Sequence, residues 1–172
     1  MRRQSFLINI CIIRQWQLEI SSVSRSNMTG NIRLDLKSSH QVPGQTAQEM
    51  TSSAPGTCFI KNGKYHVLYD EVQEGGDAVI KNHLILSEEQ MELRQKGAIR
   101  SKMVFSENKK HATDYITPYG QIPIVIHTST YEVAGLLEDA NEIRVVTNYR
   151  MESGGSNVTE CKMEITVRTL EP

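Results

Sequence analysis

Residues 57–69 read TCFIKNGKYHVLY, and this stretch indicates the fold better than any other part of the chain. Asn62-Gly63 stands between two runs that are rich in β-branched and aromatic residues. An Asn-Gly pair is favoured in type I′ turns, because both central residues of that turn need a positive φ. The stretch therefore predicts a tight β-hairpin whose arms are residues 48–61 and 65–71.

Alternation of apolar and polar residues continues this pattern in both directions along the chain. Pro55 and Gly56 are expected to interrupt the first arm, since proline cannot donate a hydrogen bond to a neighbouring strand. Residues 136–141 are the one candidate for a short helical turn, and residues 74–77 (EGGD) for a turn after the second arm. Further strands are expected at residues 28–37, 78–86, 90–96, 99–105, 111–117, 121–133, 143–151 and 161–167.

Short turns join nearly all of these expected strands. Crossover βαβ units are excluded, because no long apolar helix separates one strand from the next. A meander of roughly eight to ten strands is most stable when it closes, since closure removes its exposed edges. We therefore predict an all-β, antiparallel, up-and-down barrel, wide enough to hold side chains or one small ligand.

Size and charge limit the possible functions. The chain has 172 residues, which fits one domain. Its 19 Lys and Arg balance 20 Asp and Glu, for a formal charge of −1. This balance argues against a dedicated nucleic-acid binder, which normally carries a basic excess. Cys11, Cys58 and Cys161 are odd in number and have no metal-site spacing, so a reduced, cytoplasmic setting is the simplest interpretation.

The first 27 residues differ from the rest of the chain. Arg2 and Arg3 precede an apolar run at residues 6–13, in the order of a signal peptide, but the run is short and lacks a cleavage site. It is also too short to span a membrane, which takes about 20 apolar residues. We expect residues 1–27 to be a non-native or disordered extension before a barrel domain at residues 28–172. An extra strand or helix, or a weak export signal, remains an alternative.

Three stretches carry a resemblance to a known family. They are the hairpin at residues 57–69, Gly97 followed eight positions later by Phe105, and YITPYGQI at residues 115–122, which continues with Ile124, Ile126 and Thr128. Over residues 28–169 the chain resembles the YwiB family of bacterial calycin-type β-barrels, a domain family of unknown function. The resemblance implies a lipocalin-like barrel in an intracellular setting, and it brings no reaction, cofactor or substrate. It also implies an arginine shortly before Gly97, where this chain has Gln95, with Arg94 one position earlier.

No catalytic or metal-binding motif stands out. The five histidines lie at no recognised metal spacing, so no metal or cofactor is expected; they are His40, His66, His83, His111 and His127. The carboxylates Asp70, Glu71, Asp114 and Glu142 fall near strand ends, where solvated charges are ordinary. We expect a protein that is not an enzyme, with no membrane association.

Tyrosines and other polar side chains fall on the strand faces that alternation assigns to the barrel interior. A buried tyrosine hydroxyl needs a partner, and ligand sites are mostly apolar with a few polar groups. We predict a small, partly apolar ligand in a pocket that is lined by Tyr65, Tyr69, Tyr115, Thr147, Tyr149 and Met163. Three alternatives remain: an interior filled by tyrosines that bond to one another or to backbone, a protein- or RNA-interaction module on the barrel exterior, and an enzyme of unknown type. The oligomeric state stays open.

Overall fold

A computed structural model describes residues 28–72, 78–136, 140–155 and 157–170. Within these ranges the chain forms ten strands, which bear out the expected strand-turn-strand pattern. Their bounds are β1 (Gly30–Gln41), β2 (Gln48–Lys61), β3 (Lys64–Val72), β4 (Val79–Leu86), β5 (Met91–Gly97), β6 (Ser101–Phe105), β7 (Lys110–Thr117), β8 (Gly120–Ala134), β9 (Glu142–Ser153) and β10 (Asn157–Thr169).

All ten strands belong to one antiparallel sheet with the order β6-β5-β4-β3-β2-β1-β10-β9-β8-β7. Strands that follow each other in sequence are neighbours, apart from β6 and β7, and β1 lies beside β10. The seam falls between β6 and β7, where the residue just before β6 bridges to β7. Arg100 N donates to Ile116 O at 3.0 Å, and Ile116 N donates to Arg100 O at 2.9 Å. The sheet therefore curls into a nearly closed barrel, and the predicted all-β, antiparallel, up-and-down barrel is confirmed.

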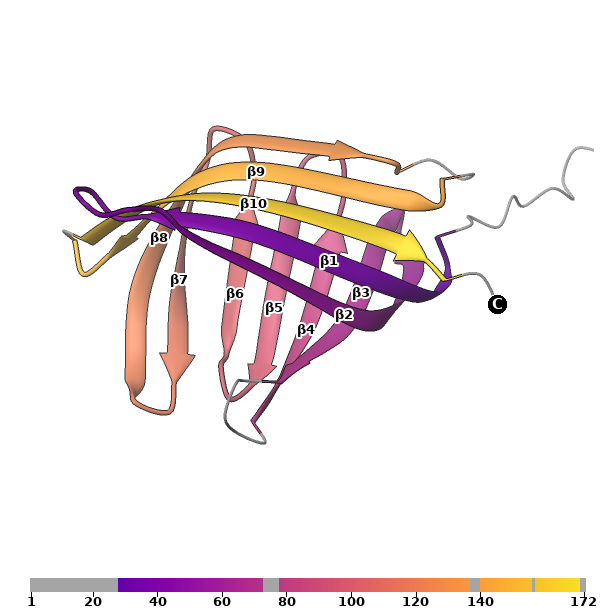
Figure 1. Cartoon of the computed structure of the whole chain (residues 1–172), viewed down its shortest axis with the longest axis horizontal. Coiled ribbons are helices and arrows are strands. Elements are labelled where there is room, and N and C mark those ends of the chain that lie inside the picture. The colour runs from indigo at the N-terminus through magenta and orange to yellow at the C-terminus, as the bar shows by residue number, and fades with distance from the viewer. Residues whose placement is uncertain (1–27, 73–77, 137–139, 156, 171–172) are drawn as a thin grey trace, which may run out of the picture.

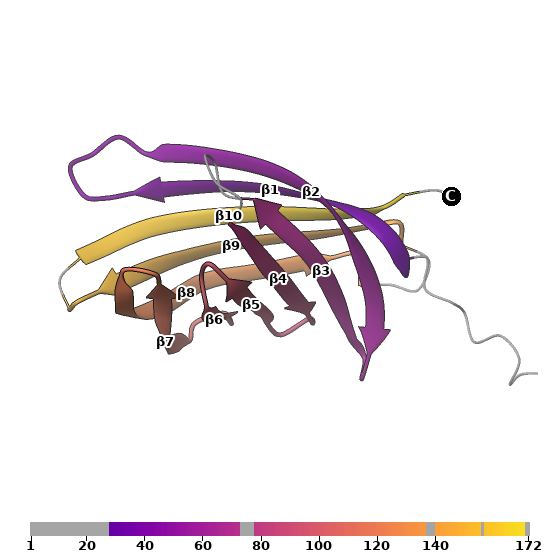
Figure 2. The ribbon, with the colours of Figure 1, turned by 90° about the horizontal axis from the view of Figure 1, so that it is seen from below.

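Two groups of strands face each other across the interior. Figure 1 shows β1, β9 and β10 running along the molecule while β3 to β6 cross behind them at a steep angle. The view in Figure 2 separates these groups into two layers. Apolar side chains from both layers form one buried cluster, whose largest fully buried members include Phe105, Met28, Ile32 and Leu34. Burying each such side chain contributes about 1.5–3 kcal/mol, so this cluster is the main source of stability.

The expected interruption of β2 at Pro55-Gly56 is wrong, because β2 continues from Gln48 to Lys61. Along β2, pairing with β3 begins only at Gly56. Pro55 therefore has a partner strand on one side, β1, and no register partner on β3. A proline is tolerated at such an edge position. Gly56 in turn allows a close approach, because a Cβ at this position would lie 2.4 Å from Leu68 O on β3.

Some predicted segments lie outside the described residues. These are the extension at residues 1–27, the turn at residues 74–77 and the centre of the expected helical turn, residues 137–139. Leu136 and Asn141, which flank that centre, have no helical conformation. The described part of the chain contains no helix with the length and apolar character that crossing a membrane requires.

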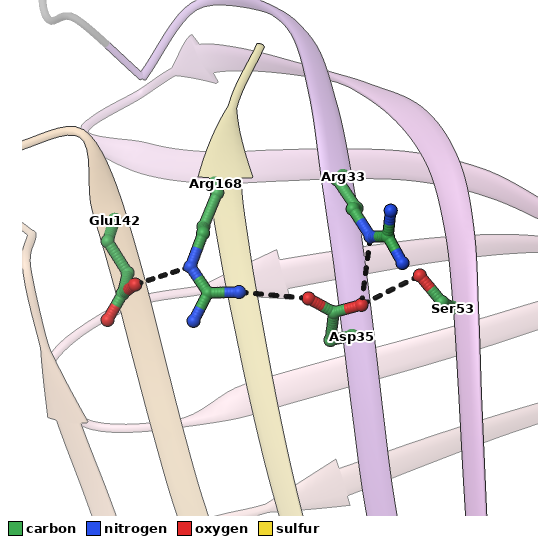
Figure 3. A network of polar contacts seen from close by, with 5 residues as sticks. All are labelled: Arg33, Asp35, Ser53, Glu142 and Arg168. Atoms are coloured by element: carbon green, nitrogen blue, oxygen red, sulfur yellow. Dashed lines mark hydrogen bonds and ion pairs between the residues drawn. The ribbon is translucent and has the colours of Figure 1, made fainter.

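Charged side chains link four neighbouring strands on the outer face (Figure 3). Arg168 of β10 donates to Asp35 of β1 at 3.0 Å and to Glu142 of β9 at 2.7 Å. Asp35 also accepts from Ser53 of β2 at 2.7 Å and from Arg33 at 3.1 Å. This network adds polar contacts along the junction of β1 and β10, which are the first and last strands of the chain.

Candidate functional site

A row of polar side chains crosses the inner face of the barrel on β3 to β6. Tyr69 is the register partner of Asn82, Asn82 of Gln95, and Gln95 of Ser101. Residues that lie opposite each other in paired strands share a face of the sheet. Asn82 is 3% exposed and Tyr69 is 4% exposed, so this face is the barrel interior.

Hydrogen bonds join this row to a carboxylate. Ser101 Oγ donates to Gln95 Oε1 at 2.9 Å, and Gln95 Nε2 donates to Asn82 Oδ1 at 3.1 Å. Asn82 Nδ2 donates to Glu71 Oε2 at 3.2 Å. Every donor in this series points toward Glu71, so the series ends on the carboxylate. We call Glu71, Asn82, Gln95 and Ser101 the inner polar chain.

The inner polar chain lies at one end of the barrel. Glu71 is the second-last residue of β3, and Ser101 is the first residue of β6. Strands β3 and β5 end here while β4 and β6 begin, at the lower end of these strands in Figure 1. A ligand that entered by this end of the barrel would meet the polar side chains before the apolar cluster.

Two tyrosines stand close to Glu71. Burial raises the pKa of the Tyr69 hydroxyl, and the nearby Glu71 carboxylate raises it further. The same two causes, in the same order, raise the pKa of half-buried Tyr115 on β7. At the seam, Arg100 bridges to Ile116. Ser101 follows Arg100 and Tyr115 precedes Ile116, so Ser101 and Tyr115 both lie next to this bridge. Both phenols are therefore uncharged at neutral pH, where each can donate and accept a hydrogen bond.

Sequence reasoning missed the inner polar chain, and it misjudged Glu71 as an ordinary solvated charge at a strand end. The signal was present in the alternation: Glu71 follows Tyr65, Val67 and Tyr69 on the inward face of β3. Gln95 likewise follows Met91 and Leu93 on β5. By contrast, Arg94 is exposed on the outer face, where its Nε contacts Glu92 Oε1.

The six predicted pocket residues do not all gather at this end. Tyr69 and Tyr115 lie near Glu71, whereas Tyr65 precedes Tyr69 by four residues on β3, or about 13 Å. The other three, Thr147, Tyr149 and Met163, come from β9 and β10 in the opposite layer. Thr147 Oγ1 donates to Thr130 O at 2.8 Å, so backbone satisfies that hydroxyl. Whether any of the six contacts a ligand stays a prediction.

A second polar row crosses the inner face on the other layer. Register pairs His40 of β1 with Cys161, Cys161 with Tyr149, and Tyr149 with Thr128. Thr128 is 3% exposed, and its Oγ1 has no hydrogen-bond partner among the described residues. Buried polar atoms are nearly always paired with protein or water, so Thr128 is an exception to this rule.

The described histidines form no metal-binding cluster, and burial raises the pKa of both buried thiols. No group of three or more His, Cys, Asp or Glu side chains in the described residues is arranged to hold a metal ion. His40 Nδ1 lies 3.4 Å from Cys161 Sγ. Burial nevertheless raises the pKa of the Cys161 thiol to about 11, although the Tyr149 hydroxyl beside it acts in the opposite direction. A reactive cysteine has a lowered pKa, so Cys161 lacks this property.

The sequence model of a family described as "Domain of unknown function (DUF1934)" matches residues 34–165 of this chain. The chain belongs to this DUF1934 family. Among solved structures, the barrel is similar to the crystal structure of the ywiB protein from Bacillus subtilis, with a TM-score of 0.72 and 19% sequence identity. The match covers 88% of this chain and 99% of that one. No curated protein matches the sequence.

The DUF1934 assignment confirms the family resemblance that was drawn from the hairpin, the Gly97–Phe105 spacing and the stretch at residues 115–122. At 19% identity, the likeness to the Bacillus subtilis structure establishes the fold alone. The DUF1934 description assigns no function.

Proposed function

We propose that the barrel is a non-catalytic binding protein that holds a small, partly apolar ligand at the end marked by the inner polar chain. The observation that carries this proposal is the directed series of hydrogen bonds from Ser101 to Glu71 on the wall of a largely apolar interior. Polar groups are costly to bury, and a few of them among apolar side chains are typical of ligand sites.

The chemistry of the chain favours a ligand that donates hydrogen bonds. A carboxylate can only accept them, and the Ser101 hydroxyl and one N–H each of Asn82 and Gln95 are already directed along the chain. An amine or a hydroxyl would therefore bind at Glu71, beside the rings of Tyr69 and Tyr115. The remainder of the ligand would pack against the apolar cluster, whose members near this end include Leu93 and Val67.

The thiols support a binding protein in the cytoplasm rather than an enzyme with a cysteine nucleophile. Cys58 and Cys161 are free and buried, and burial raises the pKa of each to about 11. Unpaired thiols are ordinary in a reducing compartment. The predicted cytoplasmic localisation is therefore kept as part of this proposal.

The proposal is tested by screening small amphiphilic amines and matched carboxylic acids against the full chain by thermal unfolding and native mass spectrometry. An amine at 100 times its Kd should stabilise the protein by about 2.7 kcal/mol, which raises Tm by several degrees. The variant Glu71→Gln should remove the preference for amines, while Glu107→Gln on an exposed turn should leave it intact. Amine and acid series that bind alike, or an amine preference that survives Glu71→Gln, would contradict the proposal.

A further inference from the structure

The outer face of β2 to β5 carries a groove that is separate from the barrel interior. Its volume is about 490 Å³, within the range of small-molecule sites. The charged residues that line it are three cations and one carboxylate, namely Lys61, Lys64, Arg94 and Glu92. Glu92 Oε1 already contacts Arg94 and lies 3.7 Å from Lys102 Nζ, so the groove has an excess of positive charge. We call it the ring groove, after the rings of Phe59, His66 and His83 that line it.

Three rings line one wall of the ring groove. Phe59 of β2 stacks on His66 of β3, with centroids 5.0 Å apart and planes inclined by 9°. His66 in turn lies beside His83 of β4, with a centroid distance of 5.1 Å and a 2.8 Å contact between His66 Nδ1 and His83 Nε2. Phe59 remains 37% exposed. His83 is tilted by 36° relative to His66, so the wall offers a ligand the exposed ring of Phe59 rather than one continuous plane.

A pair of lysines lies next to the rings. Lys61 and Lys64 are register partners. On the outer face they form the next pair after Phe59 and His66, two residues further along each strand. Like charges directly opposite each other in paired strands are destabilising, and neither lysine forms an ion pair among the described residues. Two residues along a strand span about 7 Å. An anion between the lysines would relieve their repulsion at about this distance from the ring wall.

We propose that the ring groove binds a nucleoside phosphate, with the base against Phe59 and the phosphate between Lys61 and Lys64. Every base has a flat face that can stack on an aromatic side chain, and lysine is a common partner of phosphate. The ring wall and the lysine pair match these two parts in kind and in spacing. A volume of about 490 Å³ suits one nucleotide rather than a longer strand.

The test is isothermal titration calorimetry of the full chain with adenosine 5′-monophosphate, adenosine and inorganic phosphate. The nucleotide should bind more tightly than either of its parts. Phe59→Ala should weaken nucleotide binding by about tenfold or more, because base stacking is lost. The double variant Lys61→Gln/Lys64→Gln should weaken it by a similar factor and reduce its salt dependence. Lys37→Gln, on the outer face of β1, is the matched control and should bind like the parent protein.

Other outcomes overturn the proposal. These are absence of nucleotide binding at millimolar concentration, or binding that the groove variants and the Lys37→Gln control weaken equally. Affinity for oligouridylate that rises steadily with length would replace the single-nucleotide site with a longer RNA-binding surface. Phe59→Leu keeps the apolar contact without the ring, so it serves if Phe59→Ala fails to fold by circular dichroism. Glu71→Gln should leave nucleotide binding unchanged, which separates this proposal from the interior site.

Discussion

At the scale of single residues, burial decides the chemical state of most polar groups inside the barrel. Burial raises the pKa of the tyrosines Tyr69, Tyr131 and Tyr149 and of both described thiols. Each of these groups is neutral at pH 7, and Glu71 is the carboxyl group on which the inner polar chain ends. A single carboxylate in such surroundings is why Glu71 is central to the proposed ligand site.

The thiols provide a direct test of burial. In a Cys11→Ser variant, Cys58 and Cys161 should react with Ellman's reagent only as fast as the barrel opens, and rapidly once urea unfolds it. Their folded pKa of about 11 lies above the unfolded value of about 8.5, so their contribution to stability is complete below that value. It should be lost as pH rises from about 8.5 to about 11. Rapid reaction of both thiols in the folded protein at pH 8 would contradict this prediction.

Gly97 shows how one backbone position limits the sequence. Its φ is +126°, and a Cβ would lie 2.3 Å from Val79 O of β4. Gly120 also has a positive φ, +139°, but a Cβ there would meet nothing within 4 Å. Gly120→Ala should therefore destabilise the protein by about 1–3 kcal/mol through backbone strain. Gly97→Ala should cost distinctly more, measured as a lower urea midpoint. Equal costs for the two variants would exclude the clash with Val79.

At the scale of elements, alternation along each strand assigned side chains to the interior, and register then set which of them meet. Tyr69, Asn82, Gln95 and Ser101 come from four strands, and hairpin pairing aligns them into one row. The same pairing on the outer face aligns Lys61 with Lys64 and Phe59 with His66. Both proposed sites are therefore products of strand register, although they lie on opposite faces of β3.

The outer charged network at the β1–β10 junction gives a pH-dependent prediction. Hydrogen bonds from Ser53 and Arg33 lower the pKa of Asp35, with a further contribution from Arg168. Its stabilising effect is present above the unfolded pKa of 3.8 and should be lost as pH falls through the lower folded pKa. Asp35→Asn should cost less than about 1 kcal/mol at pH 7, because exposed ion pairs contribute little.

The cost of Asp35→Asn should shrink in high salt and vanish in strong acid, measured by urea unfolding across pH. The exposed carboxylate Asp114, which has no ion pair among the described residues, provides the control through Asp114→Asn. A cost for Asp35→Asn that is the same at pH 7 and in strong acid would exclude the network as its cause.

At the scale of the whole molecule, closure creates an interior that no single hairpin contains. Strands β6 and β7 follow each other in the chain, yet in the described residues they form no ladder, and an isolated bridge joins Arg100, just before β6, to Ile116 of β7. By contrast, β1 pairs with β10 from Ile32 to Gln41, along most of β1. The fold is therefore closed firmly where the first and last strands meet and weakly at the seam, where Tyr115 and Ser101 lie on the flanking strands.

The sequence by itself determined the strands, the hairpins and the inward faces, because these depend on local turn chemistry and on a two-residue period. It was sufficient to predict the barrel, the family and the burial of Tyr69, Tyr149 and Met163. Only the tertiary structure decided which inward residues become neighbours. The hydrogen bonds of Glu71, the unpaired hydroxyl of Thr128 and the pairing of His66 with His83 depend on register between strands and on curvature of the sheet. Each of these depends on how neighbouring strands are aligned with each other, so the period along one strand could not reveal them.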